Sequence, residues 1–166
     1  KQKDYENARV NYELALQNTQ DRSLQAEIKS AIGRTYYDQE DYENAVVAYK
    51  ELLDEYPESE FVAESRLGIA DSYFKLENWS EAAAGYELVI EEHPDESDFI
   101  PYCSYQIGEA YYKMGSNLME SGEEEQGVLS LETALRWYQK TIDDYPTDPV
   151  TPHALYGAIW ALNDLD

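Results

Sequence analysis

A five-residue block recurs along this chain. Residues 4–8 read Asp-Tyr-Glu-Asn-Ala, and residues 41–45 read the same, 37 positions later. One further period reaches residues 78–82, Asn-Trp-Ser-Glu-Ala, which keep the aromatic second residue and the final alanine. Self-similarity with a period of about 20 to 50 residues is typical of solenoid proteins, in which every repeat is one small packing unit. The period therefore predicts a repeat fold before any residue is interpreted chemically.

Further columns of residues keep this register. Small residues stand at Gly33, Ala70, Gly108 and Gly157, and an aromatic residue follows each by three positions, at Tyr36, Tyr73, Tyr111 and Trp160. Tyrosines follow four alanines by four positions each, at Tyr12, Tyr49, Tyr86 and Tyr138. Prolines follow the last three of these alanines by 12 positions, at Pro57, Pro94 and Pro146. Agreement of several columns in one register indicates true repeats.

Each repeat is predicted to be a pair of helices. Apolar residues recur at helical spacing over residues 63–74 and again over residues 79–90, with a polar break between them. No stretch of useful length alternates with the period of two that a half-buried strand requires. The Tyr-Pro and His-Pro pairs end the second helix, because proline disfavours a helical conformation in the residue before it. The predicted fold class is all-α, built of antiparallel helix pairs.

The repeat resembles the tetratricopeptide repeat family. The order small, aromatic, alanine, aromatic and proline, which marks that family, is found at Gly33, Tyr36, Ala45, Tyr49 and Pro57. The resemblance covers nearly the whole chain and implies a right-handed α-α superhelix. The period of 37 exceeds the family's usual value of about 34, the first unit lacks its proline, and an insertion interrupts the fourth.

A narrower resemblance concerns bacterial cell-envelope proteins. The longer period and the endings Tyr56-Pro57 and Tyr145-Pro146 are similar to those of tetratricopeptide proteins such as the BamD and Tol-Pal coordinator groups. That similarity implies a periplasmic or cell-envelope location, and a cytoplasmic location stays open.

The repeats divide the chain as one solenoid over residues 1–166. The expected units are a partial repeat 1–22, repeats 23–58, 59–95 and 96–148, and a partial repeat 149–166. The fourth unit carries 14 extra residues, which we predict form an extended hairpin near 116–130, because seven more residues in each helix add about two turns and keep the apolar stripes in phase. A floppy loop is the alternative.

Both ends of the chain look incomplete in this register. The first helix lacks its preceding partner and the last lacks its following one, so we expect part of a longer array. The last helix should expose an apolar face that includes Ala158, Trp160, Ala161 and Leu162. End-to-end self-association is a possible consequence.

The charge limits the partners. The formal net charge is -23, with 12 basic residues among 35 acidic ones. Nucleic acid is not expected to bind, because phosphate backbones require clustered lysine and arginine. Direct membrane insertion is not expected either, because no apolar run approaches the roughly 18 residues of a spanning helix. A basic or amphipathic polypeptide is the favoured partner, although the charge can also serve solubility alone.

No catalytic, cofactor or metal site is predicted. The two histidines, His93 and His153, are far apart in the sequence, and His93 replaces the tyrosine that precedes proline in sister repeats. The single cysteine, Cys103, is expected to be a packed thiol. No combination of nucleophile, base and orienting group is visible, so an enzyme is not expected.

The functional prediction rests on the groove that the resemblance implies along the first helix of each pair. Carried over by register, its residues are Arg34, Tyr37, Asp38, Asp71, Phe74, Lys75, Tyr102, Tyr105, Glu109, Tyr112 and Lys113. Exposed aromatic rings flanked by carboxylates suit a basic or amphipathic peptide; alternatively, the rings pack between adjacent helices. The expected function is a non-catalytic protein-interaction scaffold. The alternative is a regulatory or substrate-presenting module of a larger enzyme.

Overall fold

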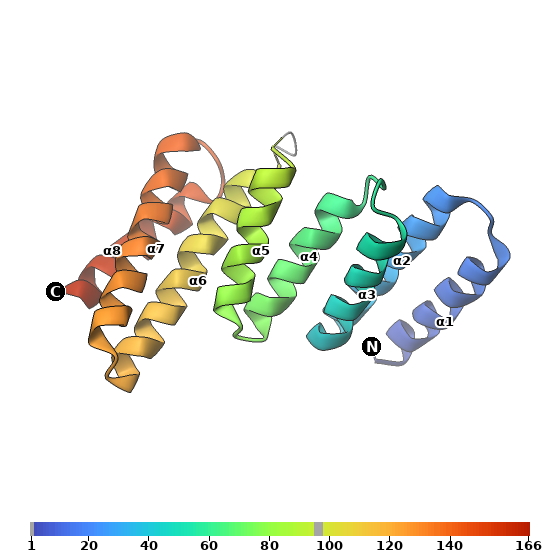
Figure 1. Cartoon of the computed structure of the whole chain (residues 1–166), viewed down its shortest axis with the longest axis horizontal. Coiled ribbons are helices and arrows are strands. Elements are labelled where there is room, and N and C mark those ends of the chain that lie inside the picture. Colours follow the sequence, from blue (N-terminus) through green and yellow to red (C-terminus); the bar gives the residue numbers. More distant parts are fainter. Residues whose placement is uncertain (1, 95–97) are drawn as a thin grey trace. The chain divides into compact units, whose positions relative to one another are not determined.

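The computed structural model describes residues 2–94 and 98–166, and these residues are almost entirely helical (Figure 1). Their eight helices are α1 (Gln2–Asn18), α2 (Arg22–Asp38), α3 (Tyr42–Glu55), α4 (Val62–Lys75), α5 (Trp79–Glu92), α6 (Ile100–Ser121), α7 (Glu124–Asp144) and α8 (Thr151–Leu165). Within the described ranges there is no strand. The prediction of an all-α fold made of antiparallel helix pairs is confirmed.

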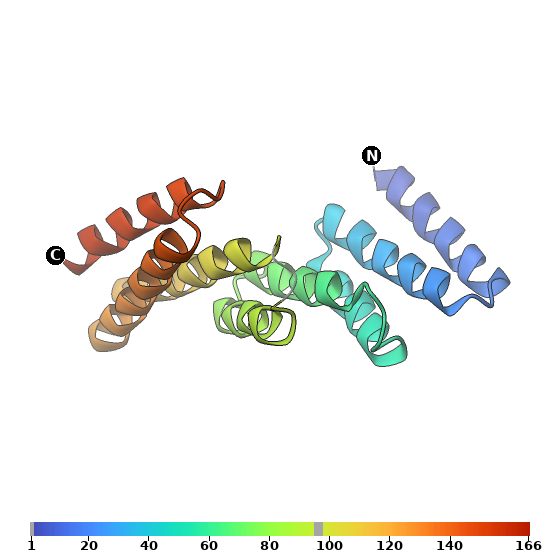
Figure 2. The ribbon, with the colours of Figure 1, turned by 90° about the horizontal axis from the view of Figure 1, so that it is seen from above.

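The chain divides into two compact units, Lys1–Glu77 with α1 to α4 and Asn78–Asp166 with α5 to α8. In the first unit α2 contacts α1, α3 and α4; in the second, α6 contacts α5, α7 and α8, and α7 also packs on α8 (Figures 1 and 2). Within each unit, every helix thus packs on its neighbours in sequence, as in other helical repeats. The division of a single solenoid into repeats stays a prediction, and its boundary at 95/96 lies outside the described residues.

One buried tyrosine organises the core of each unit. Tyr49 on α3 is 5% exposed, and its ring lies 2.6 Å and 2.5 Å from where a Cβ would stand on Gly33 and Gly68. Glycine is needed at both places because a methyl group would collide with the ring. Absence of the side chain lets α2 and α4 approach the tyrosine from two sides.

The second unit repeats this arrangement. Tyr138 on α7 is fully buried, and its ring lies 2.8 Å and 2.5 Å from where a Cβ would stand on Gly108 of α6 and Gly157 of α8. Gly68 and Gly157 each follow their tyrosine by 19 positions, whereas Gly33 and Gly108 precede theirs. Gly157 is therefore the counterpart of Gly68.

This correspondence corrects the predicted column of small residues at its last member. The residue of α8 that matches Ala70 is Ile159, not Gly157, and the register of α8 shifts by two positions. The burial pattern agrees, because Ala154 and Ala161 are fully buried in α8 just as their counterparts Ser65 and Ser72 are in α4. Gly157 is small enough to match either Ala70 or Gly68, and both of those positions allow close helix approach. Residue size alone therefore did not decide between the two alignments.

The same shift changes which face of α8 is exposed. Trp160 and Leu162 are exposed as expected, but Ala161 is fully buried in the core cluster around Tyr138, and Ala158 is half-buried against that cluster. The expectation of exposure was wrong for Ala161 because α8 turns it toward α7. Leu155 and Ile159 are exposed in its place.

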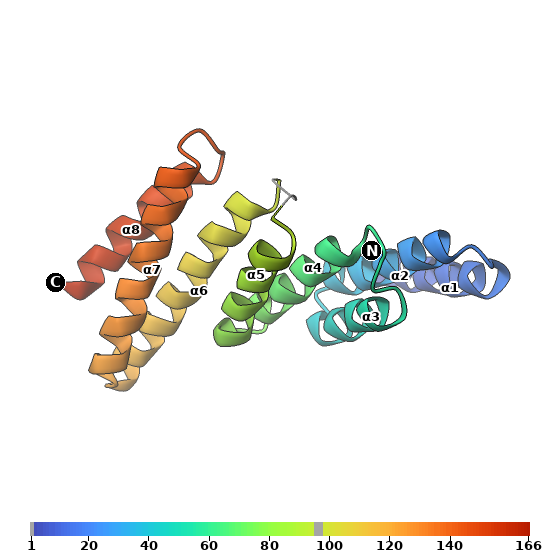
Figure 3. The same cartoon turned by 45° about the horizontal axis from the view of Figure 1, so that its top comes forward.

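The insertion in the fourth repeat lengthens two helices. With 22 and 21 residues, α6 and α7 are the longest helices described, and they meet at Gly122 (Figure 3). Gly122 has φ of 85°, a left-handed conformation that glycine adopts without a steric penalty, and it ends α6. Farther down the hairpin, Gly115 packs on Leu131 and Gly127 on Met119. The extra residues therefore form packed helix.

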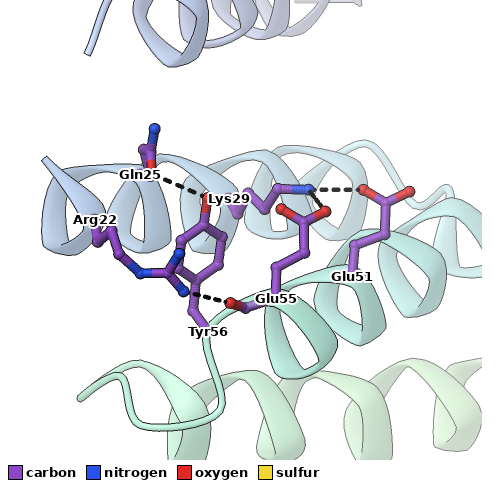
Figure 4. A network of polar contacts seen from close by, with 6 residues as sticks. All are labelled: Arg22, Gln25, Lys29, Glu51, Glu55 and Tyr56. Carbon is purple, nitrogen blue, oxygen red and sulfur yellow. Dashed lines mark hydrogen bonds and ion pairs between the residues drawn. The ribbon is translucent and has the colours of Figure 1, made fainter. Parts of the chain in front are cut away.

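Polar contacts join α2 to the end of α3 (Figure 4). The Lys29 ammonium donates to Glu51 at 3.1 Å and to Glu55 at 2.9 Å. Burial alone would lower the pKa of Lys29, but the hydrogen bonds to these two carboxylates outweigh it and raise that pKa. The Arg22 guanidinium lies 5.0 Å from the Tyr56 ring centroid and donates to the Glu55 carbonyl at 2.8 Å. These contacts fix the pair of helices in register.

Candidate partner-binding cleft

A cleft of about 450 Å³ opens between α6 and α8 in the second unit. It is lined by Tyr105, Glu109, Tyr112 and Lys113 from α6 and by His153, Tyr156, Gly157 and Trp160 from α8. The four α6 residues were all predicted to line a groove. The structure thus gathers four of the predicted residues around one hollow.

Helical periodicity explains how these side chains come together. Tyr105, Glu109 and Tyr112 are spaced four and three residues apart, which places them on one side of α6. In the corrected register, the four cleft residues of α8 are the counterparts of Glu64, Leu67, Gly68 and Asp71 on α4. Register did not predict these α8 residues, because Gly157 was aligned with Ala70 and not with Gly68. The distance of 19 positions from Tyr49 to Gly68 recurs from Tyr138 to Gly157, and an alignment based on it predicts the α8 residues of the cleft.

A carboxylate lies beside the buried tyrosine of this unit. The Tyr138 hydroxyl donates to Glu109 Oε1 at 2.6 Å. Burial raises the pKa of Tyr138, and the Glu109 charge raises it further, so the phenol keeps its proton. Burial raises the pKa of Tyr105 as well, and the Glu109 charge and a hydrogen bond to Glu109 raise it further. Among the described residues, no lysine, arginine or histidine forms an ion pair with Glu109.

Aromatic rings form the walls of the cleft. The Tyr105 ring lies 6.0 Å from the His153 ring and 6.1 Å from the Tyr138 ring, measured between centroids. Tyr156 is 67% exposed and Trp160 is 59% exposed, although both are large apolar side chains. Such exposure on adjacent turns of one helix leaves aromatic area open to a ligand.

The far end of the cleft carries charges of both signs. Lys113 Nζ lies 6.0 Å from the centroid of the Tyr112 ring, at the outer limit of a cation–π contact. Burial raises the pKa of Tyr112, and the Asp164 carboxylate at the end of α8 raises it further. The acidic side therefore includes Glu109 and Asp164, and the basic side includes the exposed Lys113.

Tyr102 was predicted to belong to the same groove, but it faces a different helix. Its ring meets that of the buried Tyr86 on α5 edge to face, with centroids 6.2 Å apart. Its hydroxyl accepts a hydrogen bond from Gln106 Nε2 at 2.9 Å. Tyr102 is not among the residues that line the cleft, so its described contacts are those of a packing residue.

Six predicted groove residues lie in the first unit. Arg34 of α2 forms an ion pair with Glu64 of α4. The Tyr37 ring packs edge to face on Tyr42, with centroids 5.3 Å apart, and rests against the core cluster around Tyr49. Burial raises the pKa of Tyr37 to about 12, with a further contribution from Asp71. Tyr37 is half-buried, so one part of its ring packs between helices and the other part stays accessible.

The remaining three differ in exposure. Phe74 is half-buried on α4, whereas Asp38 and Lys75 are exposed at the ends of their helices. The predicted ladder of Tyr37, Phe74 and Tyr112 has members in both units and stays a prediction.

A larger cleft of about 570 Å³ surrounds the turn at residues 56–60 in the first unit. Its cation, Arg22, is already engaged by the Tyr56 ring and the Glu55 carbonyl. It contains none of the predicted groove residues. We therefore regard the α6–α8 cleft as the candidate site.

No three histidine, cysteine or acidic side chains among the described residues lie close enough together to hold a metal ion. No helix in the described ranges combines the length and apolar character needed to cross a membrane.

Repeated antiparallel helix pairs with this tyrosine and glycine pattern define a protein of the tetratricopeptide type. Residues 23–164 match the family model YfiO, described as an outer membrane lipoprotein, and the chain belongs to that family. The predicted resemblance to cell-envelope proteins of this type is thereby confirmed.

Known structures and curated proteins add little more. The crystal structure of MamA is similar over 98% of this chain and 89% of its own, with 19% identity and a TM-score of 0.49. No curated protein matches the sequence.

Proposed function

We propose that this chain is a non-catalytic protein-interaction scaffold of the cell envelope that holds basic or amphipathic segments of partner polypeptides. The observation that carries the proposal is the α6–α8 cleft, where exposed aromatic rings stand around a carboxylate. Interfaces draw most of their energy from such aromatic anchors. Membership of an outer membrane lipoprotein family supports the location.

The net charge of the chain supports a positively charged partner segment. At -23, the chain attracts a basic segment over a Debye length of about 8 Å at physiological salt. Electrostatic attraction mainly raises the association rate, whereas the rings determine how long the complex lasts. A segment with both basic and apolar residues uses both effects.

Self-association is part of the proposal, as the weaker interaction. The exposed apolar residues Leu155, Ile159 and Leu162 occupy the side of α8 that corresponds to the α7-facing side of α6. A second copy could supply a helix there. Repulsion between two chains of charge -23 opposes this contact, so we expect it only at high protein concentration.

The test is affinity capture from an envelope extract with the wild type and a Tyr37→Ala, Tyr112→Ala double variant. Each ring contributes about 1 to 3 kcal/mol if it is an anchor, so the double variant should lose the specific partners. Leu129→Ala is the matched control, because Leu129 is 60% exposed on α7 and lies outside the cleft. Recovery of the same proteins by wild type and double variant would show that the groove is not the binding surface.

A further inference from the structure

The two units differ at one pair of positions across the groove. In the first unit Arg34 of α2 is neutralised by Glu64 of α4. In the second unit Glu109 takes the place of Arg34, and His153 takes the place of Glu64 in the corrected register. No described cation pairs with Glu109. The second unit thus presents a carboxylate where the first unit contains a completed ion pair.

We propose that the α6–α8 cleft is a recognition site for one lysine or arginine side chain of the partner polypeptide, with Glu109 as the anion that pairs with it. This proposal rests on the proposed scaffold function and specifies what the partner presents. The occupant follows from charge complementarity, because no described cation pairs with the carboxylate of this aromatic-walled cleft. The aromatic faces of Tyr105, Tyr112 and Trp160 contact the methylene stem and the cationic head.

Glu109 is held in place before any ligand arrives. Its Oε1 accepts the hydroxyl proton of Tyr138 at 2.6 Å, and the Tyr138 ring is fixed between Gly108 and Gly157. Tyr105 forms a second hydrogen bond to Glu109, and neither phenol neutralises the charge of the carboxylate. A positioned acceptor loses little conformational entropy on binding, which favours a specific pair over a loose surface contact.

The cleft is large enough for one long side chain. A volume of about 450 Å³ lies in the lower half of the range of about 300 to 1,000 Å³ found for small-ligand pockets. Aromatic rings near a carboxylate attract a cation through the negative faces of the rings as well as through the charge. An uncharged side chain of equal length would gain only the apolar contact.

Lys113 affects the affinity of the same cleft for a cation in the direction opposite to Glu109. Its ammonium lies near the Tyr112 ring and competes with an incoming cation for that face. Lys113 is exposed, so its removal leaves the core unchanged. Lys113→Gln should therefore tighten binding of a cation, whereas Glu109→Gln should weaken it.

The test uses two capped 11-residue peptides with identical leucine and serine flanks, one with a central lysine and the other with norleucine. Binding to the whole chain is followed by NMR at the Trp160 indole N–H, which is assigned by its loss in Trp160→Phe. We expect the lysine peptide to bind about fivefold more tightly than the norleucine peptide. Glu109→Gln should remove most of that difference, because glutamine still accepts the Tyr138 hydroxyl but carries no charge.

Glu132→Gln is the matched control, since it removes one exposed carboxylate of α7 outside the cleft. Equal binding of the two peptides, or no lysine-dependent shift at Trp160 up to about 10 mM peptide, would overturn the proposal. An equal effect of Glu109→Gln and Glu132→Gln would also overturn it, because the general field of the chain would then explain the preference. If the captured partners still depend on Tyr37 and Tyr112, the scaffold function survives that failure.

Discussion

The two units hold their central tyrosine in the same way but surround it with different charges. Tyr49 and Tyr138 each lie between two glycines, at almost equal distances. Beside Tyr49 stands Arg34, which is paired with Glu64, and no described hydrogen bond involves the Tyr49 hydroxyl. Beside Tyr138 stands Glu109, which accepts the tyrosine hydroxyl. The packing of the central tyrosine is therefore common to both units. The charge differs at the residue after the first glycine, which is Arg34 in one unit and Glu109 in the other.

This difference shows how a repeat fold separates stability from specificity. The glycine and tyrosine positions determine helix approach, and they tolerate no larger residue without rearrangement. The next position along α2 or α6 faces the groove, where its charge affects partners more than the core. In the first unit the charge at that position is neutralised by an ion pair. In the second unit the Glu109 carboxylate accepts a hydrogen bond but has no described cation beside it, so its charge is available to a partner.

The largest expected effect comes from removing the central rings. Tyr49→Ala and Tyr138→Ala should each lower the free energy of unfolding by about 3 to 5 kcal/mol, because each leaves a large cavity between two helices. Urea unfolding monitored by circular dichroism measures the loss. Similar losses in both units would support a common packing role.

Tyr49→Phe and Tyr138→Phe provide the controls, since both keep the ring. Tyr49→Phe should be nearly neutral, whereas Tyr138→Phe should cost about 1.5 to 3 kcal/mol, because the hydroxyl bond to a charged Glu109 is lost. Equal effects of the two phenylalanine variants would contradict the distinction drawn between the units.

Much of this architecture could be predicted from the sequence, because the same residue pattern recurs in several repeats and each copy supports the assignment of the others. The 37-residue period predicts the repeats and the apolar spacing predicts the helix pairs. The groove implied by the family resemblance, carried over by register, includes Tyr105, Glu109, Tyr112 and Lys113. The α8 residues of the cleft could not be predicted in this way, because Gly157 fits the columns of both Ala70 and Gly68 by size. Only its contact with Tyr138 shows that it belongs to the column of Gly68. The contact of Tyr102 with Tyr86 depends on how α5 lies against α6, which the repeat register does not specify.

An intermediate effect is expected at alkaline pH. Burial raises the pKa of Tyr49 to about 12, although the nearby Arg34 opposes that rise. The unfolded chain ionises its tyrosines near pH 10, so Tyr49 contributes stability that is fully present below pH 10 and is lost as the pH rises toward 12. Over that window the loss is about 1.4 kcal/mol per pH unit for one tyrosine.

Comparison of wild type with Tyr49→Phe isolates this contribution. Measured by urea unfolding at pH 9 and pH 11, the wild type should lose about 1.4 kcal/mol relative to the variant. Burial and Glu109 raise the pKa of Tyr138, so the corresponding loss should extend to higher pH there. An unchanged difference between wild type and variant at the two pH values would show that the Tyr49 hydroxyl ionises freely in the folded chain.

The smallest expected effect concerns the ion pair that distinguishes the first unit. Arg34 and Glu64 are partly exposed, so a double-mutant cycle with Arg34→Gln and Glu64→Gln should give a coupling of about 0.2 to 1 kcal/mol. In 1 M salt the Debye length falls to about 3 Å, and the coupling should largely disappear. The matched cycle in the second unit uses Glu109→Gln and His153→Gln, whose side chains form no described ion pair, and should give a coupling near zero. A coupling between Glu109 and His153 as large as that between Arg34 and Glu64 would mean that the second cleft is already neutralised, and its carboxylate would then be unavailable to a partner's cation.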